Sequence, residues 1–185
     1  MPGRTRAPRD TYCSFCGAAH TQSGYPRTCP GCGVTIWANP IPVAVVLVPL
    51  LHEGRRGLLV VRRGIEPARG KLALPGGFLE EHERWQDGAA REVREETGVL
   101  VEPTTLEPFG YVSTEPKPNR VLLFSVATRP TQIPPHVPNA ETAERGVVFG
   151  LGGLEAEMGF PLHFSAARSF LEREGLLGPH DYRAI

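Results

Sequence analysis

Hydrophobic residues form short runs along this chain, and the first long run begins shortly after residue 40. Residues 43–48 are continuously apolar, which is typical of a strand that is buried on both faces. Residues 58–61 predict a partner strand, because residues 52–57 between the two runs carry the glycines and charges of an exposed turn. The pattern therefore predicts a sheet whose first two strands follow each other along the chain.

A helical pattern begins after Glu83 and ends at Gly98, where a glycine provides a C-terminal stop. A short apolar segment, residues 72–74, precedes it and runs into Pro75 and two glycines. Within the predicted helix, small and apolar residues recur at a spacing of three or four, which turns one face toward a core. These residues are Ala89, Ala90, Val93 and Thr97.

Further strands are predicted after the helix, at residues 109–113, 121–127 and 147–149. The proline-rich segments 115–120 and 129–146 predict loops between them, since proline cannot donate to a strand ladder. Ser165 begins another run with helical spacing. We therefore expect a closing helix that has Ser165 as its N-cap.

The first forty residues differ in composition from the rest of the chain. Residues 1–10 contain three arginines and two prolines without apolar periodicity, and we expect a flexible leader there. Residues 11–38 hold all four cysteines but too few aliphatic side chains to build a core unaided. We therefore expect a boundary near Asn39 and Pro40, with the main domain at residues 39–185.

Charge and hydropathy exclude several classes of protein. The 20 basic residues equal the 20 acidic residues, so no overall positive field exists to hold nucleic acid or an anionic membrane. The longest apolar run, residues 41–51, is shorter than the ~20 residues of a spanning helix and contains two prolines. The N-terminus lacks the apolar segment of a secretory signal. We therefore expect a cytoplasmic protein without membrane or nucleic-acid partners.

Three glutamates share one face of the predicted helix. Glu92, Glu95 and Glu96 have the i, i+3, i+4 spacing that brings carboxylates together. Because like charges at this spacing destabilise a helix, the arrangement favours divalent cations, and oxygen ligands suit magnesium or manganese beside a phosphate. The alternative is a solvated acidic face balanced by three arginines, which are Arg84, Arg91 and Arg94.

The wider pattern resembles the Nudix box and matches it at every defined position, as Gly77-x5-Glu83-x7-Arg91-Glu92-Val93-x-Glu95-Glu96-x-Gly98-Val99. The resemblance implies an α/β fold, the Nudix α/β/α sandwich, and a nucleotide substrate. It implies Mg or Mn ligands at Gly77, Glu92, Glu95 and Glu96. It also implies that Arg91 orients the site and that Glu83 lies near the outer metal shell. The catalytic base varies in this family, so the candidates are Glu92, Glu95, Glu141 and Glu144.

The four cysteines form two C-x2-C pairs with twelve residues between them. The pairs are Cys13 with Cys16 and Cys29 with Cys32, and a glycine follows each pair. Four thiolates at this spacing favour a closed tetrahedral zinc site of structural type. Two disulfides or a rubredoxin-like iron site are the alternatives. Since Arg27 is the only fixed positive charge in residues 11–37, we expect a structural or homodimer-forming role rather than contact with nucleic acid.

A zinc ribbon immediately before a Nudix domain resembles the bacterial NADH pyrophosphatases and related zinc-ribbon Nudix hydrolases. Those enzymes carry an S-Q-P-W-P-F-P-x-S motif after the box, whereas residues 113–120 here read STEPKPNR. The Trp and Phe of that motif are missing, which leaves NADH specificity open. Pro116, about seventeen residues beyond the box, resembles ADP-ribose pyrophosphatases, and an incidental loop proline is the alternative.

The expected activity is the Mg- or Mn-dependent hydrolysis of the pyrophosphate bond in a nucleoside diphosphate linked to another group, such as ADP-ribose, NADH or FAD. Two alternatives stay open. The first is a housecleaning hydrolase of oxidised nucleoside triphosphates. The second is a regulator that binds a nucleotide without cleaving it.

Overall fold

The computed structural model describes residues 11–115, 119–128 and 133–185. The chain divides into two compact units, Met1–Pro40 and Ile41–Ile185. The predicted leader at residues 1–10 and the proline at position 116 lie outside the described residues. Within the described residues, no helix combines the length and the apolar character needed to cross a membrane.

The first unit is built on two turns that carry the cysteines. Gly17 and Gly33 follow the two cysteine pairs with φ angles of 75° and 76°, a left-handed conformation that suits glycine. Their backbone N–H groups donate to the carbonyls of Cys13 and Cys29, at 2.9 and 3.0 Å. The second turn lies between β1 (Arg27–Thr28) and β2 (Thr35–Ile36), and the two-residue antiparallel ladder between these strands closes it.

The second unit contains two sheets among its described residues. The first has the order β7 (Gly76–Phe78), β3 (Ile41–Leu47), β9 (Arg120–Ala127) and β8 (Leu106–Ser113), with β3 parallel to β9. The second has the order β11 (Tyr182–Ala184), β10 (Thr142–Val148), β5 (Arg55–Arg63) and β4 (Pro49–His52), and β6 (Leu72–Ala73) pairs with β5. Both sheets therefore mix neighbours from distant parts of the chain.

The chain passes from one sheet to the other at Val48. β3 ends at Leu47 and β4 begins at Pro49, so one extended segment contributes a strand to each sheet. β4 forms a hairpin with β5 through the two-residue turn Glu53–Gly54, where both φ angles are positive. The prediction that β3 and β5 are partners is therefore wrong, because the chain changes sheets before the turn.

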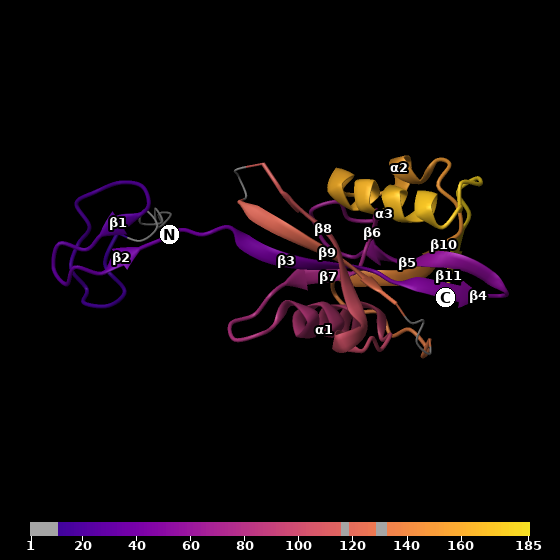
Figure 1. Cartoon of the computed structure of the whole chain (residues 1–185), viewed down its shortest axis with the longest axis horizontal. Coiled ribbons are helices and arrows are strands. Elements are labelled where there is room, and N and C mark those ends of the chain that lie inside the picture. The colour runs from indigo at the N-terminus through magenta and orange to yellow at the C-terminus, as the bar shows by residue number, and fades with distance from the viewer. Residues whose placement is uncertain (1–10, 116–118, 129–132) are drawn as a thin grey trace, which may run out of the picture. The chain divides into compact units, whose positions relative to one another are not determined.

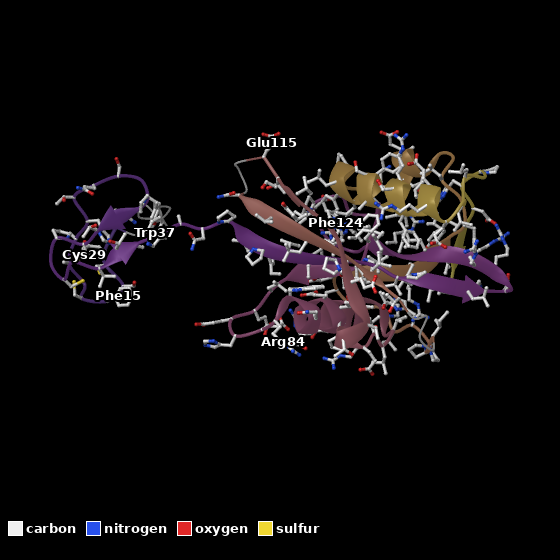
Figure 2. All side chains as sticks on the ribbon, in the orientation of Figure 1. Phe15, Cys29, Trp37, Arg84, Glu115 and Phe124 are labelled. Atoms are coloured by element: carbon white, nitrogen blue, oxygen red, sulfur yellow. The ribbon has the colours of Figure 1, made fainter. Side chains whose placement is uncertain are left out.

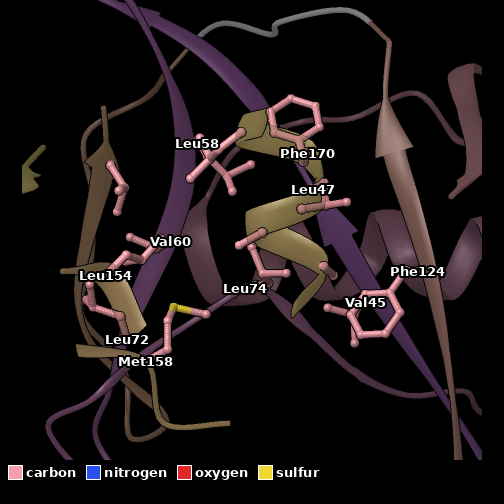
Figure 3. Close-up of a cluster of buried hydrophobic side chains, with 14 of the residues drawn as sticks. Val45, Leu47, Leu58, Val60, Leu72, Leu74, Phe124, Leu154, Met158 and Phe170 are labelled. Carbon is pink, nitrogen blue, oxygen red and sulfur yellow. The ribbon is translucent and has the colours of Figure 1, made fainter. Parts of the chain in front are cut away.

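Helices cover both faces of the sheets. Figure 1 shows α1 (Trp85–Thr97) on one side, and α2 (Leu154–Glu157) and α3 (Pro161–Arg173) on the other. The side chains of β3 alternate between the two layers: Val45 and Leu47 join the cluster under α3 that Figure 3 shows, while Ala44 and Val46 pack under α1. β3 is thus buried on both faces, as predicted, and the α/β/α sandwich is confirmed.

The C-terminal third differs from the prediction in three places. β10 begins at Thr142, inside the segment that was predicted as a loop. The strand was missed because Arg145, a polar residue within it, is buried and donates to backbone carbonyls instead of facing solvent. α3 begins at Pro161, the favoured proline at a helix start, and Ser165 lies inside the helix and donates to the Pro161 carbonyl. Neither α2 nor β11 was predicted.

Candidate active site and metal centre

Helix α1 carries the glutamates, and its ends are fixed by local interactions. The Arg84 side chain forms two hydrogen bonds with Asp87 at the start of the helix, at 2.6 and 2.9 Å. At the other end Gly98 has a φ of 72° and its N–H donates to the Arg94 carbonyl at 2.7 Å. Ala89 and Val93 are fully buried on the inner face. The helix is therefore anchored with its acidic face at the border of the core.

The short strand β7 meets this helix through its glycines. The N–H of Gly76 donates to Glu96 Oε2 at 2.9 Å. Gly77 packs directly on the carboxylate of Glu92, and a side chain at this position would collide with it. Glycine is therefore required at position 77 for the close approach of Glu92.

Arg91 holds most of the other acidic side chains together. Its Nε and Nη2 donate to the two carboxylate oxygens of Glu83, at 2.9 and 3.0 Å. Its Nη1 donates to Glu92 at 2.7 Å and to Glu95 at 3.1 Å. A further bond from Nη2 reaches the Phe78 carbonyl at 3.0 Å, so the guanidinium ties the loop before α1 to the helix. Arg91 thereby fixes three carboxylates in one place.

Burial raises the pKa of the two inner glutamates, Glu92 and Glu96. Glu96 is only 9% exposed, and this desolvation raises its pKa to about 7 despite the bond from Gly76. Desolvation also raises the pKa of Glu92, and the neighbouring Glu95 and Glu141 add to the rise. In contrast, the hydrogen bonds from Arg91 lower the pKa of Glu83. A cation beside Glu92 and Glu96 would stabilise their ionised forms.

The structure brings Glu83, Glu92 and Glu95 onto Arg91, while Glu96 faces β7. Glu141 and Glu144, the two candidates for the catalytic base that follow the box, have different surroundings. Glu141 lies close enough to Glu92 and Glu96 to raise the pKa of both. Glu144 is held elsewhere, by Arg62 at 3.2 Å and by the hydroxyl of Tyr182. Of the two, Glu141 is therefore the glutamate whose charge acts on the acidic site.

Sequence reasoning missed two residues that border this site. Arg63, at the end of β5, is near enough to Glu96 to favour its ionised form. Asn139 donates from Nδ2 to the Glu95 carbonyl at 2.9 Å. The sequence could have indicated Arg63, because a basic residue there directly ends a buried apolar strand. No signal in the sequence pairs Asn139 with the helix.

Four aromatic side chains that could stack on a nucleotide base lie in different settings. Phe78 lies under the guanidinium of Arg120, whose central carbon is 5.1 Å from the ring centre, and Tyr111 is 83% exposed on β8. Trp85 packs against the cluster under α1. Trp37 projects from the N-terminal unit (Figure 2) and is 64% exposed. Of these, Phe78 is the one that lies beside the glycines of the site.

The four cysteines lie together in the first unit. Their ligand atoms all lie within 4.8 Å of one another, and they are the only such group of three or more metal-ligating residues among the residues that the structure describes. The Sγ atoms of Cys13 and Cys32 are 3.8 Å apart, and those of Cys16 and Cys29 are 3.6 Å apart. A tetrahedral zinc with Zn–S bonds of about 2.3 Å separates its sulfurs by about 3.8 Å. The cluster therefore fits a four-thiolate metal centre.

The thiols of this cluster are free, and the surroundings of Cys29 favour its thiolate, whereas the pKa of Cys32 is raised to about 12 by burial and by the neighbouring cysteines. Hydrogen bonding from the Cys32 backbone lowers the pKa of Cys29 to about 6, and the Gly31 N–H contributes a second bond at 3.3 Å. Arg27 is 7% exposed and bonds to the hydroxyl of Tyr25 at 2.8 Å. The fixed positive charge of residues 11–37 is therefore buried and hydrogen-bonded inside the unit.

Comparison with known proteins agrees with this geometry. The protein NAD-capped RNA hydrolase NudC of Stutzerimonas stutzeri is 30% identical over 166 residues, which are 87% of this chain and 54% of that protein. An ADP-ribose pyrophosphatase of Methanocaldococcus jannaschii is 38% identical over 55 residues, 30% of this chain and 32% of that protein. The chain spans about half the length of the NudC relatives and about a third of the pyrophosphatase.

Solved structures share the fold. The crystal structure of a NUDIX hydrolase from Nitrosomonas europaea matches with a TM-score of 0.67 and 24% identity, covering 91% of this chain and 94% of that one. The NUDIX domain of Shewanella oneidensis NrtR, crystallised with ADP ribose, matches with a TM-score of 0.53 and 20% identity over 76% of this chain and 90% of that one. The family model described as NUDIX domain matches residues 40–160, which include the whole acidic site. The chain therefore belongs to the Nudix family.

Proposed function

We propose that this protein is a Mg- or Mn-dependent hydrolase that cleaves the pyrophosphate bond of a nucleoside diphosphate linked to another group and releases two monophosphates. One observation carries the proposal: the half-buried Glu92 and the buried Glu96 lie against the glycines of β7, and burial raises the pKa of both carboxyl groups. Two such carboxylates fit a divalent cation better than they fit a merely solvated acidic surface.

The residues that would hold the metal are Gly77, through its carbonyl, and Glu92, Glu95 and Glu96, through their carboxylates. Hard oxygen donors of this kind match magnesium and manganese. When bound, the metal would neutralise charge on the phosphate oxygens and lower the pKa of a water molecule. Arg91 would keep Glu92 and Glu95 oriented, since it donates to both at 2.7 and 3.1 Å, and Glu83 would in turn fix Arg91.

The proton of the attacking water needs an acceptor at this site. Glu92, Glu95 and Glu141 are the candidates whose surroundings support that role, because Glu141 lies near Glu92 and Glu96. Glu144 is a weaker candidate, since its carboxylate is already bonded to Arg62 and to Tyr182. We assign Glu95 first as a ligand and not as the base.

The substrate class we propose is ADP-ribose, NADH or FAD. The relatives named above include NAD-capped RNA hydrolases and an ADP-ribose pyrophosphatase, and all of these names refer to molecules with a nucleoside diphosphate core. Arg63 lies near Glu96 and would contact a phosphate there. Because residues 113–120 lack the aromatic pair of the NADH pyrophosphatase motif, we place ADP-ribose first among the three.

We further propose that the four cysteines bind one structural zinc ion and that the N-terminal unit has a structural or homodimer-forming role. The spacing of the sulfurs supports the metal, and zinc would supply folding energy that the few aliphatic side chains of this unit cannot. Metal analysis of freshly reduced protein should find about one zinc per chain. A clearly lower content would contradict the four-thiolate site.

A substrate panel tests the proposal. The purified protein is incubated with ADP-ribose, NADH, FAD and an oxidised deoxynucleoside triphosphate, each with Mg²⁺ or Mn²⁺, and the products are separated by chromatography. Two monophosphates from a dinucleotide support the proposed reaction. A monophosphate with pyrophosphate from the triphosphate would favour the housecleaning alternative, and binding without turnover would favour the regulator.

A pair of matched variants tests the metal assignment in the same assay. Glu95→Gln should abolish turnover while the thermal unfolding curve stays unchanged, because it removes a charged ligand from an exposed position on the helix surface. Glu53→Gln, in the turn between β4 and β5, is the control and should keep full activity. Retained activity in Glu95→Gln would contradict the ligand set.

A further inference from the structure

Asn139 makes hydrogen bonds in two directions at the start of the segment that leads into β10. Its side-chain Oδ1 accepts from the backbone N–H groups of Glu141 and Thr142, at 2.9 and 2.7 Å. Its side-chain Nδ2 donates to the Glu95 carbonyl in the last turn of α1, at 2.9 Å. One amide therefore joins a turn that carries a glutamate to the helix that carries the box glutamates.

The bond to Glu95 satisfies a group that the helix itself leaves free. The last four carbonyls of an α-helix have no partner within the helix. Gly98 takes the carbonyl of Arg94, Arg145 donates to that of Thr97, and Asn139 takes that of Glu95. Two side chains from around β10 thus hold the C-terminal end of α1, and they flank Glu141 on either side.

The turn at residues 139–142, called the Glu141 turn below, is also held by the residue that follows β5. The N–H of Gly64 donates to the Glu141 carbonyl at 2.7 Å, directly after β5 ends at Arg63. The N–H of Asn139 donates to the Thr142 carbonyl at 3.0 Å and closes the turn. With its backbone held at both sides, the exposed Glu141 has its position set by the Asn139 amide and by β5.

We propose that Asn139 is a positioning residue that ties the Glu141 turn to helix α1 and so holds the Glu141 carboxylate beside Glu92 and Glu96. The inference rests on the proposed function and deepens it, since it makes Glu141 a working member of the site and makes Asn139 its support. The pKa of Glu92 and of Glu96 is raised partly by Glu141, which agrees with this placement.

The competing explanation is that Asn139 only shapes a local turn, as asparagine commonly does by accepting nearby backbone N–H groups. The two explanations differ in the donated bond. Asn139→Asp keeps an oxygen for the Glu141 and Thr142 N–H groups but loses the N–H that reaches the Glu95 carbonyl. Asn139→Ala loses all three bonds. A turn-forming role predicts that the aspartate variant behaves as the wild type.

A double-mutant cycle tests the proposal with the best substrate of the panel. We expect Glu141→Gln to lower kcat about 100-fold or more, and Asn139→Asp to lower it about 10- to 100-fold with KM unchanged, because small displacements of a reacting group have effects of this size. In the Glu141→Gln background, Asn139→Asp should lower kcat no further, since its effect passes through Glu141. Asn39→Asp, an exposed asparagine ahead of β3, is the control and should match the wild type.

The outcomes separate clearly. Three results would each overturn the positioning role. The first is an equal kcat for Asn139→Asp and the wild type, and the second is a kcat of Glu141→Gln that is unaffected. The third is a loss of kcat from Asn139→Asp that persists in the Glu141→Gln background. If Asn139→Ala does not fold, the aspartate variant alone decides, because it keeps the turn. An inactive wild type contradicts the proposed function itself, whereas an active wild type with any of these three results contradicts only the inference about Asn139 and Glu141.

Discussion

His163 makes the stability of this protein sensitive to acid. Its ring lies in the first turn of α3, is 9% exposed, and packs against Phe124, a residue labelled in Figure 2, and against Phe160. The buried Nδ1 has no hydrogen-bond partner among the described residues. Desolvation, with a smaller contribution from Arg63, lowers the pKa of His163 from an ordinary 6.5 to about 4. The folded state therefore holds the neutral ring, and protonation favours unfolding.

The sign and size of the effect follow from this shift. Because the folded pKa is depressed, the contribution of His163 to stability is complete above pH 6.5 and is lost as the pH falls from 6.5 toward 4. Each pH unit in this window changes the free energy of unfolding by about 1.4 kcal/mol. Between pH 7 and pH 5 the loss is about 2 kcal/mol, and it reaches about 3 kcal/mol near pH 4.

Urea unfolding of the wild type and of His163→Leu at pH 7 and pH 5 measures this contribution. Other groups also titrate in acid, so the quantity of interest is the difference between the two proteins at each pH. We expect the leucine variant to gain about 2 kcal/mol relative to the wild type when the pH is lowered from 7 to 5, because leucine cannot bind a proton. If both proteins lose the same stability over this range, the burial argument for His163 is refuted.

Three other perturbations test the acidic site, the buried Arg145 and the N-terminal unit. Gly77→Ala should lower turnover about 100-fold by displacing Glu92, whereas Gly110→Ala, which adds a methyl group in open space, should not. Arg145→Ala should lower the free energy of unfolding, measured in urea, by about 3 kcal/mol, since two bonds from a buried guanidinium are lost. A zinc chelator should unfold the N-terminal unit, as followed by Trp37 fluorescence, and leave the unfolding transition of the second unit unchanged.

The local parts of the molecule could be predicted from the sequence because their signals lie close together. The glutamate spacing, the stop at Gly98 and the buried face with Ala89 and Val93 all belong to one helix, and the structure has that helix at Trp85–Thr97. The same holds for the cysteine pairs, where a glycine with positive φ follows each pair. Short-range periodicity and turn chemistry determine both features.

Long-range pairings could not be predicted in this way. The continuous apolar run at residues 43–48 does not show that the chain leaves one sheet at Val48 and enters another, so the pairing of β5 with β4 was missed. The start of β10 was missed because Arg145, a residue that is usually exposed, is buried and bonded to carbonyls from distant segments. The partners that explain such a residue are visible only after folding.

The same reasoning applies to the border of the site. The box residues carry their own spacing, but Asn139 is 44 residues away from the helix carbonyl that it meets. Glu141 and Glu144 were equivalent candidates in the sequence. They differ in the structure because Glu144 points to the Arg62 and Tyr182 side chains, while Glu141 lies near the box glutamates.

The passage of one extended segment through both sheets restricts how this chain can vary in length. An insertion between β3 and β4 at Val48 would shift the alternation of side chains in one sheet relative to the other, and a shift of one residue turns every side chain of a strand to the opposite face. The connection that joins β9 to β10 is restricted in another way, because Asn139 and Glu141 within it bond to the last turn of α1 and to the residue after β5. Functional variants of this chain should therefore keep the length of the segment from Ile41 to His52 fixed, and should also keep the hydrogen-bonded turn at residues 139–142.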